Sequence, residues 1–367
     1  MNKNKHVLGI SGGKDSAALA LYLNERHPQL DIDYYFCDTG RELDETYELI
    51  EKLETVLNKR ITPLEAVKDS PSGSPFDHYL DIFGGYLPSS QSRWCTRKLK
   101  LEPFEEYVGD DPVISYVGIR GDENREAYIS AKSNIQSIFP FRKNIWSEDV
   151  IGKLLSNTNT EFLASLFESL LDTKRLDIAM QVINRPLSPE FEQEQKLNLL
   201  LDISIPIFNQ VVFQFLKSTE YPLATEEDFP LLENEDVLVK EDIFRILRES
   251  GVGVPQYYED VEFEINGQTG TYARTRSGCF FCFFQQKIEW VWLYEQHPER
   301  FQKAVEYEKD GYTWMQDECL EDLIKSERIQ QIKKDHLTRL KIAKHKSTNR
   351  LLDILEDEEQ GCAACFI

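Results

Sequence analysis

Six consecutive residues near the N-terminus combine glycine with hydroxyl, amino and carboxyl side chains: Ser11, Gly12, Gly13, Lys14, Asp15 and Ser16. They follow an apolar run, His6–Ile10, that predicts a buried strand, and they lead into Ser16–Arg26, whose periodicity predicts a helix. Glycine lets the backbone turn sharply and approach a ligand closely. The free N–H groups at the start of a helix, together with the helix dipole, attract an anion. The pattern therefore predicts a loop that binds phosphate, with Lys14 as a positive charge against it.

The spacing of this loop is not that of a Walker A loop, G-x-x-x-x-G-K-[ST]. Its form, S-G-G-x-D-S, resembles the loop of the ATP pyrophosphatases of the PP-loop superfamily, which cleave ATP between the α- and β-phosphates, adenylate an acceptor and release pyrophosphate. The resemblance implies that the β- and γ-phosphates are held by Ser11, Gly12, Gly13 and Ser16. It implies a catalytic role for Lys14 in stabilising the leaving pyrophosphate. It also implies a Mg²⁺ contact from Asp15 or Asp38, and the sequence leaves that choice open.

Further segments resemble the phosphoadenosine phosphosulfate reductase-like branch of this superfamily. They are Asp38–Thr39–Gly40 with Glu45–Thr46, Cys95–Pro103, Gly118–Glu123 and Gly278–Cys282. The resemblance extends over Lys5–Phe141 and Glu241–Lys309. It implies that Asp38 and Gly40 contact the nucleotide and that Arg120 has a catalytic role beside the phosphates. Ion pairing of Arg120 with nearby carboxylates is the alternative.

Two features separate the chain from the sulfonucleotide reductases of that branch. It keeps the Lys14–Asp15 pair, which such reductases alter because they need not split ATP. Its tail, Gly361–Cys365, does not have their Glu-Cys-Gly-x-His form. The pattern is most similar to that of DndC-like proteins of DNA phosphorothioation and bacterial defence islands. We therefore expect an enzyme that adenylates an acceptor with ATP and then transfers sulfur. The alternatives are a phosphoadenosine phosphosulfate or adenylylsulfate reductase, and an ATP-sensing subunit of a defence complex.

The seven cysteines of the chain include a pair with the spacing of metal ligands, Cys279 and Cys282. The resemblance adds Cys95 as a third ligand and implies a [4Fe–4S] cluster, with zinc as the second choice of metal. A fourth ligand could be Cys319, a cysteine of the tail, or none. Buried free thiols are the alternative, since cysteine also packs as a small apolar side chain.

Alternating elements are expected to position these residues. Apolar runs at Ile32–Cys37 and Pro112–Ile119 predict strands, and the spacing of apolar residues in Asp44–Leu57 predicts a helix. Alternating strands and helices predict an α/β fold with a parallel sheet flanked by helices, and the resemblance implies that it is adenine nucleotide alpha hydrolase-like. Ligands bind such sheets at the carboxyl ends of the strands.

We expect four consecutive segments along the chain. Residues 1–145 would form the PP-loop nucleotide-binding α/β domain, and residues 146–238, with helical periodicity almost throughout, a helical insertion. Residues 239–310 would continue the reductase-like domain with the C-x-x-C loop. Residues 311–367 would form a C-terminal helix, predicted over Glu321–Lys346, and an acidic tail.

The net charge of the 367-residue chain is −22 at pH 7, which argues against broad binding to nucleic acid by the chain alone. We therefore expect protein partners that deliver sulfur or a nucleic-acid substrate, and an oligomer is left open. No apolar stretch approaches the roughly 20 residues of a membrane helix, and Met1–Lys5 lacks a signal-peptide core. We expect no membrane contact and a cytoplasmic location.

Overall fold

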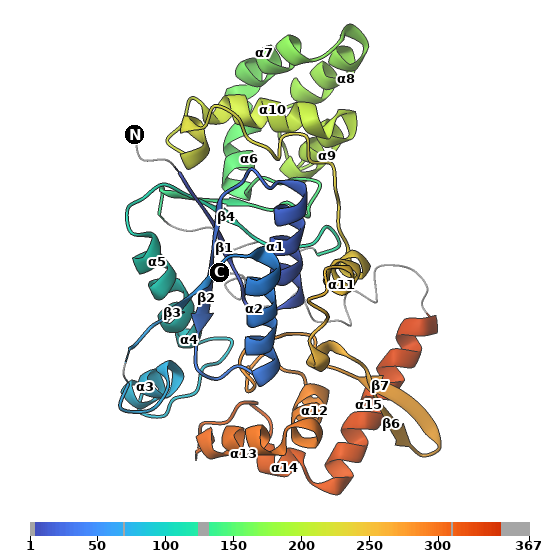
Figure 1. Ribbon diagram of the computed structural model, residues 1–367. Helices are drawn as coiled ribbons and strands as arrows, with labels where there is room; N and C mark the ends of the chain where they lie inside the picture. The colour runs from blue at the N-terminus through green and yellow to red at the C-terminus, as the bar shows by residue number, and fades with distance from the viewer. Residues whose placement is uncertain (1–3, 69, 124–131, 310, 346–367) are drawn as a thin grey trace. The chain divides into compact units, whose positions relative to one another are not determined.

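The computed structural model describes residues 4–68, 70–123, 132–309 and 311–345 (Figure 1). The chain forms two compact units. Unit 1 is built from residues 1–9, 18–34 and 108–246, and unit 2 from residues 10–17, 35–107 and 247–367. Each unit therefore joins segments that are far apart in the sequence.

Five strands form one sheet in the order β3-β2-β1-β4-β5. Their bounds are Lys5–Gly9 for β1, Ile32–Asp38 for β2, Ile61–Glu65 for β3, Val113–Tyr116 for β4 and Ile135–Ile138 for β5. β1 pairs with β4, and β4 with β5, in parallel. Every residue of β4 and β5 is buried, as in parallel sheets that are covered on both faces. The predicted α/β fold with a parallel sheet flanked by helices is confirmed.

The helices of the first third include α1 (Lys14–Arg26), α2 (Asp44–Leu57) and α3 (Pro75–Ile82). Between Trp94 and Val108 the structure has α4 (Trp94–Thr96), a π-helical turn η1 (Arg97–Leu101) and α5 (Glu102–Val108). Pro103, which has no N–H to donate, is the second residue after the widened turn.

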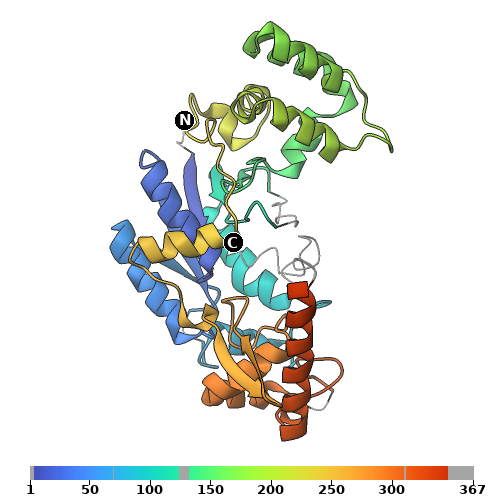
Figure 2. The ribbon, with the colours of Figure 1, turned by 90° about the vertical axis from the view of Figure 1, so that its right-hand side faces the viewer.

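The expected helical region lies in unit 1 and is confirmed (Figure 2). It consists of α6 (Glu148–Leu154), η2 (Asn157–Asn159), α7 (Thr160–Leu170), α8 (Thr173–Ile183), α9 (Gln193–Ile203), α10 (Ile205–Leu216) and η3 (Pro222–Thr225). α10 is its most apolar helix and buries Phe208, Val212 and Leu216 completely. The fully buried Lys196 donates to Ile183 O at 2.8 Å, which satisfies a carbonyl at the end of α8.

The last third begins with α11 (Lys240–Glu249) and η4 (Gln256–Tyr258). A hairpin of β6 (Val261–Ile265) and β7 (Gln268–Tyr272) follows, and the sequence pattern had not led us to expect it. Its two-residue turn has positive φ at Asn266 and Gly267, as the tight turns of twisted hairpins require. Four helices complete the unit: α12 (Lys287–Gln296), α13 (Pro298–Tyr307), α14 (Leu320–Leu323) and α15 (Ser326–His345).

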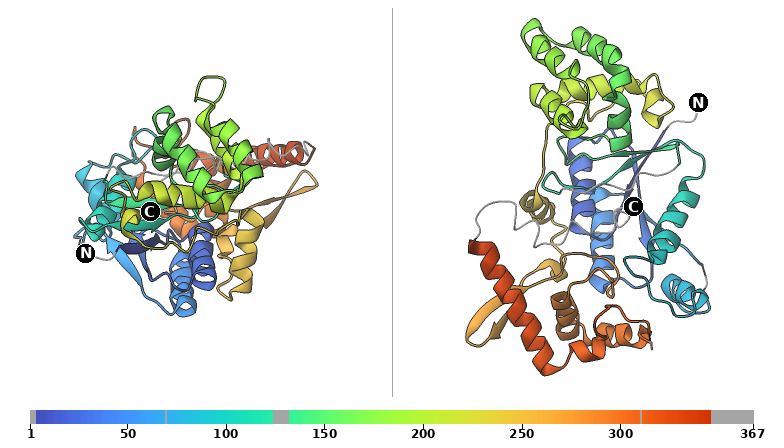
Figure 3. Two further views of the ribbon diagram at one scale, coloured as in Figure 1. Left: turned by 90° about the horizontal axis from the view of Figure 1, so that it is seen from above. Right: turned by 180° about the vertical axis from the view of Figure 1, so that it is seen from behind.

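The helix predicted over Glu321–Lys346 is confirmed over Ser326–His345, which is α15, but the structure places Glu321 in a separate short helix, α14. This division lets Leu320 and Leu323 enter the core of unit 2. α15 packs along the hairpin of β6 and β7, as Figure 3 shows. That core is rich in aromatic rings. The ring of Phe281 stacks on that of Trp314, with 4.8 Å between the ring centroids, and its centroid lies 4.4 Å from that of Phe76.

Among the described helices, none by itself has the length and apolar character needed to cross a membrane. Only α9 and α10 taken together, bent by 119° at their junction, would meet that requirement by length and composition.

Candidate functional site

The loop between β1 and α1 has the shape that a phosphate site requires. Gly12 has a φ of +73°, and a Cβ atom there would lie 2.3 Å from Cγ2 of Thr46 in α2. Ile10 N donates to Tyr35 O at 2.7 Å, so that β2 runs beside the start of the loop. A side chain at position 12 is thus excluded twice, by backbone conformation and by the neighbouring helix.

Hydrogen bonds of the two serines fix the conformation of the loop. Ser11 N donates to Ser16 Oγ at 3.1 Å, the two hydroxyl oxygens lie 3.1 Å apart, and Ser16 Oγ donates to Gly13 O at 3.2 Å. The loop leads directly into α1, a helix of 13 residues. Hydroxyls and backbone N–H groups at the start of such a helix form a binding site for an anion.

Lys14 lies in this loop and is almost fully buried, with 3% of its surface exposed. Its Nζ is 3.5 Å from Asp15 Oδ2, 3.5 Å from Thr275 O and 4.9 Å above the ring of Tyr258. The aromatic face and the carboxylate stabilise the ammonium group in a site of low polarity. The structure therefore brings Lys14 and Asp15 together with the loop residues, as expected.

A segment from the last third of the chain supports the loop. Tyr257 OH donates to Gly12 O at 2.7 Å, and Ser277 Oγ donates to Ser11 O at 3.2 Å. Tyr258 OH accepts from Lys14 N at 3.4 Å. Sequence reasoning missed these three residues, because a tyrosine pair and a serine carry no motif of their own.

The end of β2 carries an acidic pair in the same unit. Asp38 Oδ1 accepts from Gly40 N at 2.7 Å and from Tyr47 OH at 2.9 Å, which fixes the orientation of the carboxylate. Gly40 has a φ of +70°, and a Cβ there would lie 2.9 Å from Cβ of Ser74. Glu42 is buried and accepts from Thr39 Oγ1 at 2.7 Å. Asp38 and Gly40, both predicted to contact the nucleotide, thus belong to the unit that holds the loop.

Burial and, as the second cause, the negative charge of Asp38 together raise the pKa of Glu42 from 4.5 to about 7. Cys279 Sγ lies 3.3 Å from Thr39 Oγ1 and 4.0 Å from Glu42 Oε1. Since Thr39 donates its proton to Glu42, the Cys279 thiol is the donor to Thr39. A hydrogen-bonded path leads from the thiol to the carboxyl group, and sequence reasoning did not select Glu42 for it.

The three cysteines predicted to hold a metal are not assembled as ligands. Cys95 and Cys279 both pack against the aromatic core of unit 2, and Cys282 lies one turn after Cys279. In the part of the chain that the structure describes, no three His, Cys, Asp or Glu side chains are arranged to hold a metal ion. Burial raises the pKa of the Cys279 thiol. As arranged here, these residues do not fit the [4Fe–4S] cluster or zinc. Cys362 and Cys365 lie outside the described residues.

Arg120 belongs to unit 1, unlike the loop. It is buried, with Nε 2.9 Å from Asp122 Oδ1 and Nη1 2.9 Å from Glu123 Oε1. Its charge is therefore balanced by carboxylates of its own segment, which corresponds to the alternative that the sequence left open. A catalytic role for Arg120 stays a prediction.

Comparison with known proteins agrees with the geometry of the loop. Residues 5–160 match the family model of the phosphoadenosine phosphosulfate reductase domain. Two uncharacterized proteins of Methanocaldococcus jannaschii are similar to parts of this chain. One is 31% identical over 158 residues, 39% of this chain and 31% of that protein. The other is 32% identical over 111 residues, 29% of this chain and 24% of that protein. The chain thus spans less than a third of the length of these relatives. The comparison supports a nucleotide-binding domain of the reductase-like branch of the PP-loop superfamily.

Gly12→Ala tests the close approach of the loop to α2. The control is Gly251→Ala, at a φ of +79° with open space around it, which we expect to lower the free energy of unfolding by about 1–2 kcal/mol through backbone strain alone. Gly12→Ala should lower it by about 1–3 kcal/mol more, because the added methyl group meets Thr46. Adding Thr46→Ser, which removes Cγ2, should recover part of that difference in urea unfolding. Equal destabilisation at the two glycines would contradict the packing described.

The raised pKa of Glu42 predicts a pH dependence of stability in the absence of nucleotide and divalent cations. The folded protein keeps a proton that the unfolded chain loses between pH 4.5 and about 7, so the free energy of unfolding should fall as the pH rises through this range. Glu42→Gln, which carries no charge, should be more stable than the native protein at pH 8 by about 1–3 kcal/mol. The exposed Glu48→Gln on the following helix, α2, is the matched control. A native stability that rises over this range, with no gain from Glu42→Gln, would show that the carboxyl group is ionised in the folded protein.

Proposed function

We propose that this chain is a PP-loop enzyme of the ATP pyrophosphatase type, which adenylates an acceptor and releases pyrophosphate. The observation that supports the proposal is the loop at the start of α1. In this loop Ser11 and Ser16 are hydrogen-bonded to each other, Gly12 has a positive φ, and Lys14 is buried. The match of residues 5–160 to a family that acts on adenine sulfonucleotides supports the choice of nucleotide.

The proposed reaction is a displacement at the α-phosphorus of ATP. An acceptor oxygen forms a bond to the α-phosphorus, the bond to the bridging oxygen of the β-phosphate breaks, and pyrophosphate leaves with the negative charge. The loop N–H groups and Lys14 would hold the β- and γ-phosphates and stabilise that charge. Mg²⁺, which commonly takes one or two carboxylates besides phosphate oxygens, would balance charge on the phosphates. We favour Asp38 as its ligand, because Asp38 is oriented by two hydrogen bonds while Asp15 shares its charge with Lys14.

The finer part of the proposal is sulfur transfer to the adenylated acceptor, as in DndC-like proteins, with AMP as the leaving group and a donor supplied by a protein partner. The sulfur, at the oxidation level of sulfide, would form a bond to the activated atom of the acceptor as the bond to the AMP oxygen breaks. Delivery by partners suits a chain with a net charge of −22, which would not attract a nucleic acid broadly. Sulfonucleotide reduction is the second candidate, because the matched family is named for it.

Equilibrium titration of the anaerobically purified protein with ATP, adenylylsulfate and phosphoadenosine phosphosulfate, in the presence of Mg²⁺, tests the choice of nucleotide. We expect ATP to bind most tightly. Lys14→Met should weaken ATP binding at least about tenfold through loss of a charge-assisted contact, while Lys325→Met, at an exposed ion pair, should leave it unchanged. Tighter binding of either sulfonucleotide would favour reduction instead.

Pyrophosphate release from ATP, measured with and without cell extract as a source of acceptor, separates an enzyme from an ATP sensor. We expect Asp15→Ala to abolish release, because it removes the carboxylate that accompanies Lys14 in the loop. Asp322→Ala, an exposed carboxylate of the same unit, is the control. ATP binding without any pyrophosphate release by the native protein, in extract that supplies acceptors, would favour the sensor.

A further inference from the structure

The two donors that Lys14 would offer to a phosphate are engaged by other groups of unit 2. Its backbone N donates to Tyr258 OH at 3.4 Å, and its Nζ lies 4.9 Å above the ring of Tyr258 and donates to Thr275 O at 3.5 Å. Only 3% of the lysine surface is exposed. A phosphate group is larger than a water molecule, so it cannot reach both donors of Lys14 until part of this covering moves.

Two hydroxyl groups of the same covering lie over the loop at Gly13. A Cβ atom at Gly13 would be 3.2 Å from Ser277 Oγ and 3.6 Å from Tyr258 OH. Ser277 Oγ also donates to Ser11 O at 3.2 Å. We refer to Tyr258, Thr275 and Ser277 as the cover of the loop. The cover occupies space beside the backbone of the loop, where a phosphate would have to enter.

The residues of the cover are not held equally firmly. Thr275 donates twice to Glu289 Oε1, from its N at 2.7 Å and from its Oγ1 at 2.9 Å, and Glu289 is itself buried in the first turn of α12. Hydrogen bonds to a carboxylate are strong, so Thr275 is well anchored. Tyr258 is half-buried, and its bond to Lys14 N is longer than the roughly 2.7–3.2 Å usual for such bonds. Tyr258 is therefore the residue of the cover that is displaced most easily.

A phosphate oxygen is a better partner for Lys14 than the hydroxyl of Tyr258. The hydroxyl of a tyrosine is neutral near pH 7, whereas a phosphate oxygen carries negative charge. Hydrogen bonds to an ionised acceptor are about twice as strong as those between neutral groups. An anion that takes the place of the hydroxyl at Lys14 N also gains the nearby ammonium group as a second contact, which favours the exchange.

We propose that Tyr258 is the gating residue of the phosphate loop, and that its side chain covers Lys14 until the phosphates of a nucleotide displace it. Thr275 stays in place in this exchange, while Tyr258 turns away from the loop. The inference rests on the proposed function only in requiring that a nucleotide enters the loop. Labelling and binding can be measured whether or not pyrophosphate is released, which separates failure of this inference from failure of the proposed function.

Acetylation of Lys14 in the full-length protein, followed by mass spectrometry, tests the cover without any nucleotide. We expect Lys14 to react at least about tenfold more slowly than Lys325, whose side chain is 70% exposed, because a covered amine reacts only when the structure opens locally. Tyr258→Ala should speed the reaction of Lys14 about threefold or more, since a hydrogen bond and a cation–π contact are lost. Tyr294→Ala, at an exposed tyrosine of the same unit, is the matched control. An unchanged rate in Tyr258→Ala would overturn the proposal, because other groups would then cover the lysine.

Equilibrium titration with pyrophosphate, ATP and phosphoadenosine phosphosulfate tests the displacement itself. Tyr258→Phe keeps the ring and removes only the hydroxyl, so a ligand at Lys14 N no longer has to break a hydrogen bond. We expect this variant to bind each ligand that the native protein binds about threefold or more tightly, and Tyr294→Phe to bind as the native protein does.

Equal binding by Tyr258→Phe and the native protein would show that the hydroxyl does not compete with the ligand. Weaker binding by Tyr258→Phe would show that the hydroxyl holds the phosphate instead of giving way to it. Either result would overturn the proposal, as would the absence of binding of all three ligands to both proteins at millimolar concentration.

Discussion

The hydrogen bond from Tyr257 to the carbonyl of Gly12 joins the phosphate loop to a segment 245 residues further along the chain. Ser277 and Tyr258 add two contacts of the same kind. A glycine loop is flexible by nature, and an anion site is effective only when its N–H groups point at the ligand before it arrives. The C-terminal third of the chain therefore takes part in shaping this loop, even though the family match ends at residue 160.

Burial of charge gives this region its chemical character. Lys14 and Asp15 lie together with little contact with water, and Glu42 is enclosed beside Asp38. In such surroundings burial and a like charge nearby favour the protonated form, which is why the pKa of Glu42 is raised to about 7. The same burial raises the pKa of the Cys279 thiol. One physical cause thus sets the protonation of both groups.

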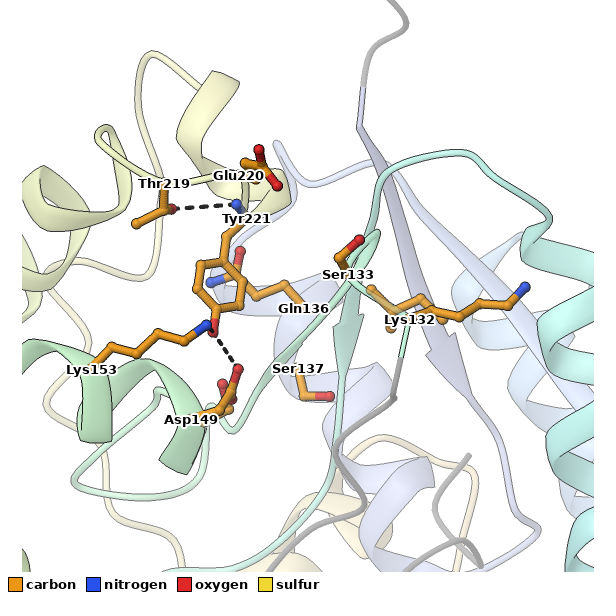
Figure 4. A pocket seen from close by; sticks show the side chains of 11 residues that line it. Lys132, Ser133, Gln136, Ser137, Asp149, Lys153, Thr219, Glu220 and Tyr221 are labelled. Carbon is orange, nitrogen blue, oxygen red and sulfur yellow. Dashed lines mark hydrogen bonds between the residues drawn. The ribbon is translucent and has the colours of Figure 1, made fainter.

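The helical region of unit 1 is more than an interruption of the α/β domain. It contributes α6 and the turn before η3 to a pocket beside β5, in which Asp149 accepts a hydrogen bond from Tyr221 (Figure 4). Its stability comes from apolar packing around α10 and from Lys196, which binds the end of α8 from inside the core. A folded core of this kind holds Asp149 and Tyr221 in fixed orientations, as specific recognition requires.

The sequence by itself determined the helices, strands and turns that depend only on residues close together in the chain. The strand, glycine loop and helix at His6–Arg26, and the helix Asp44–Leu57, follow from apolar periodicity and turn residues within a few positions. The hairpin at Val261–Tyr272 was equally readable, since alternating residues flank Asn266–Gly267, but that signal was overlooked. Local patterns also gave the loop residues and Asp38, because motif residues lie next to one another in the chain.

Only the tertiary structure decided which distant residues meet. It placed Tyr257 and Ser277 against the loop, Cys279 beside Glu42, and Arg120 in an ion pair with its own neighbours. It also divided the expected C-terminal helix so that Leu320 and Leu323 could enter the aromatic core. Such contacts join positions separated by up to 266 residues, as for Ser277 and Ser11, and they depend on how apolar faces pack. The periodicity of apolar residues within a segment indicates which face is buried. Only the packed core determines which residues that face and its polar neighbours contact.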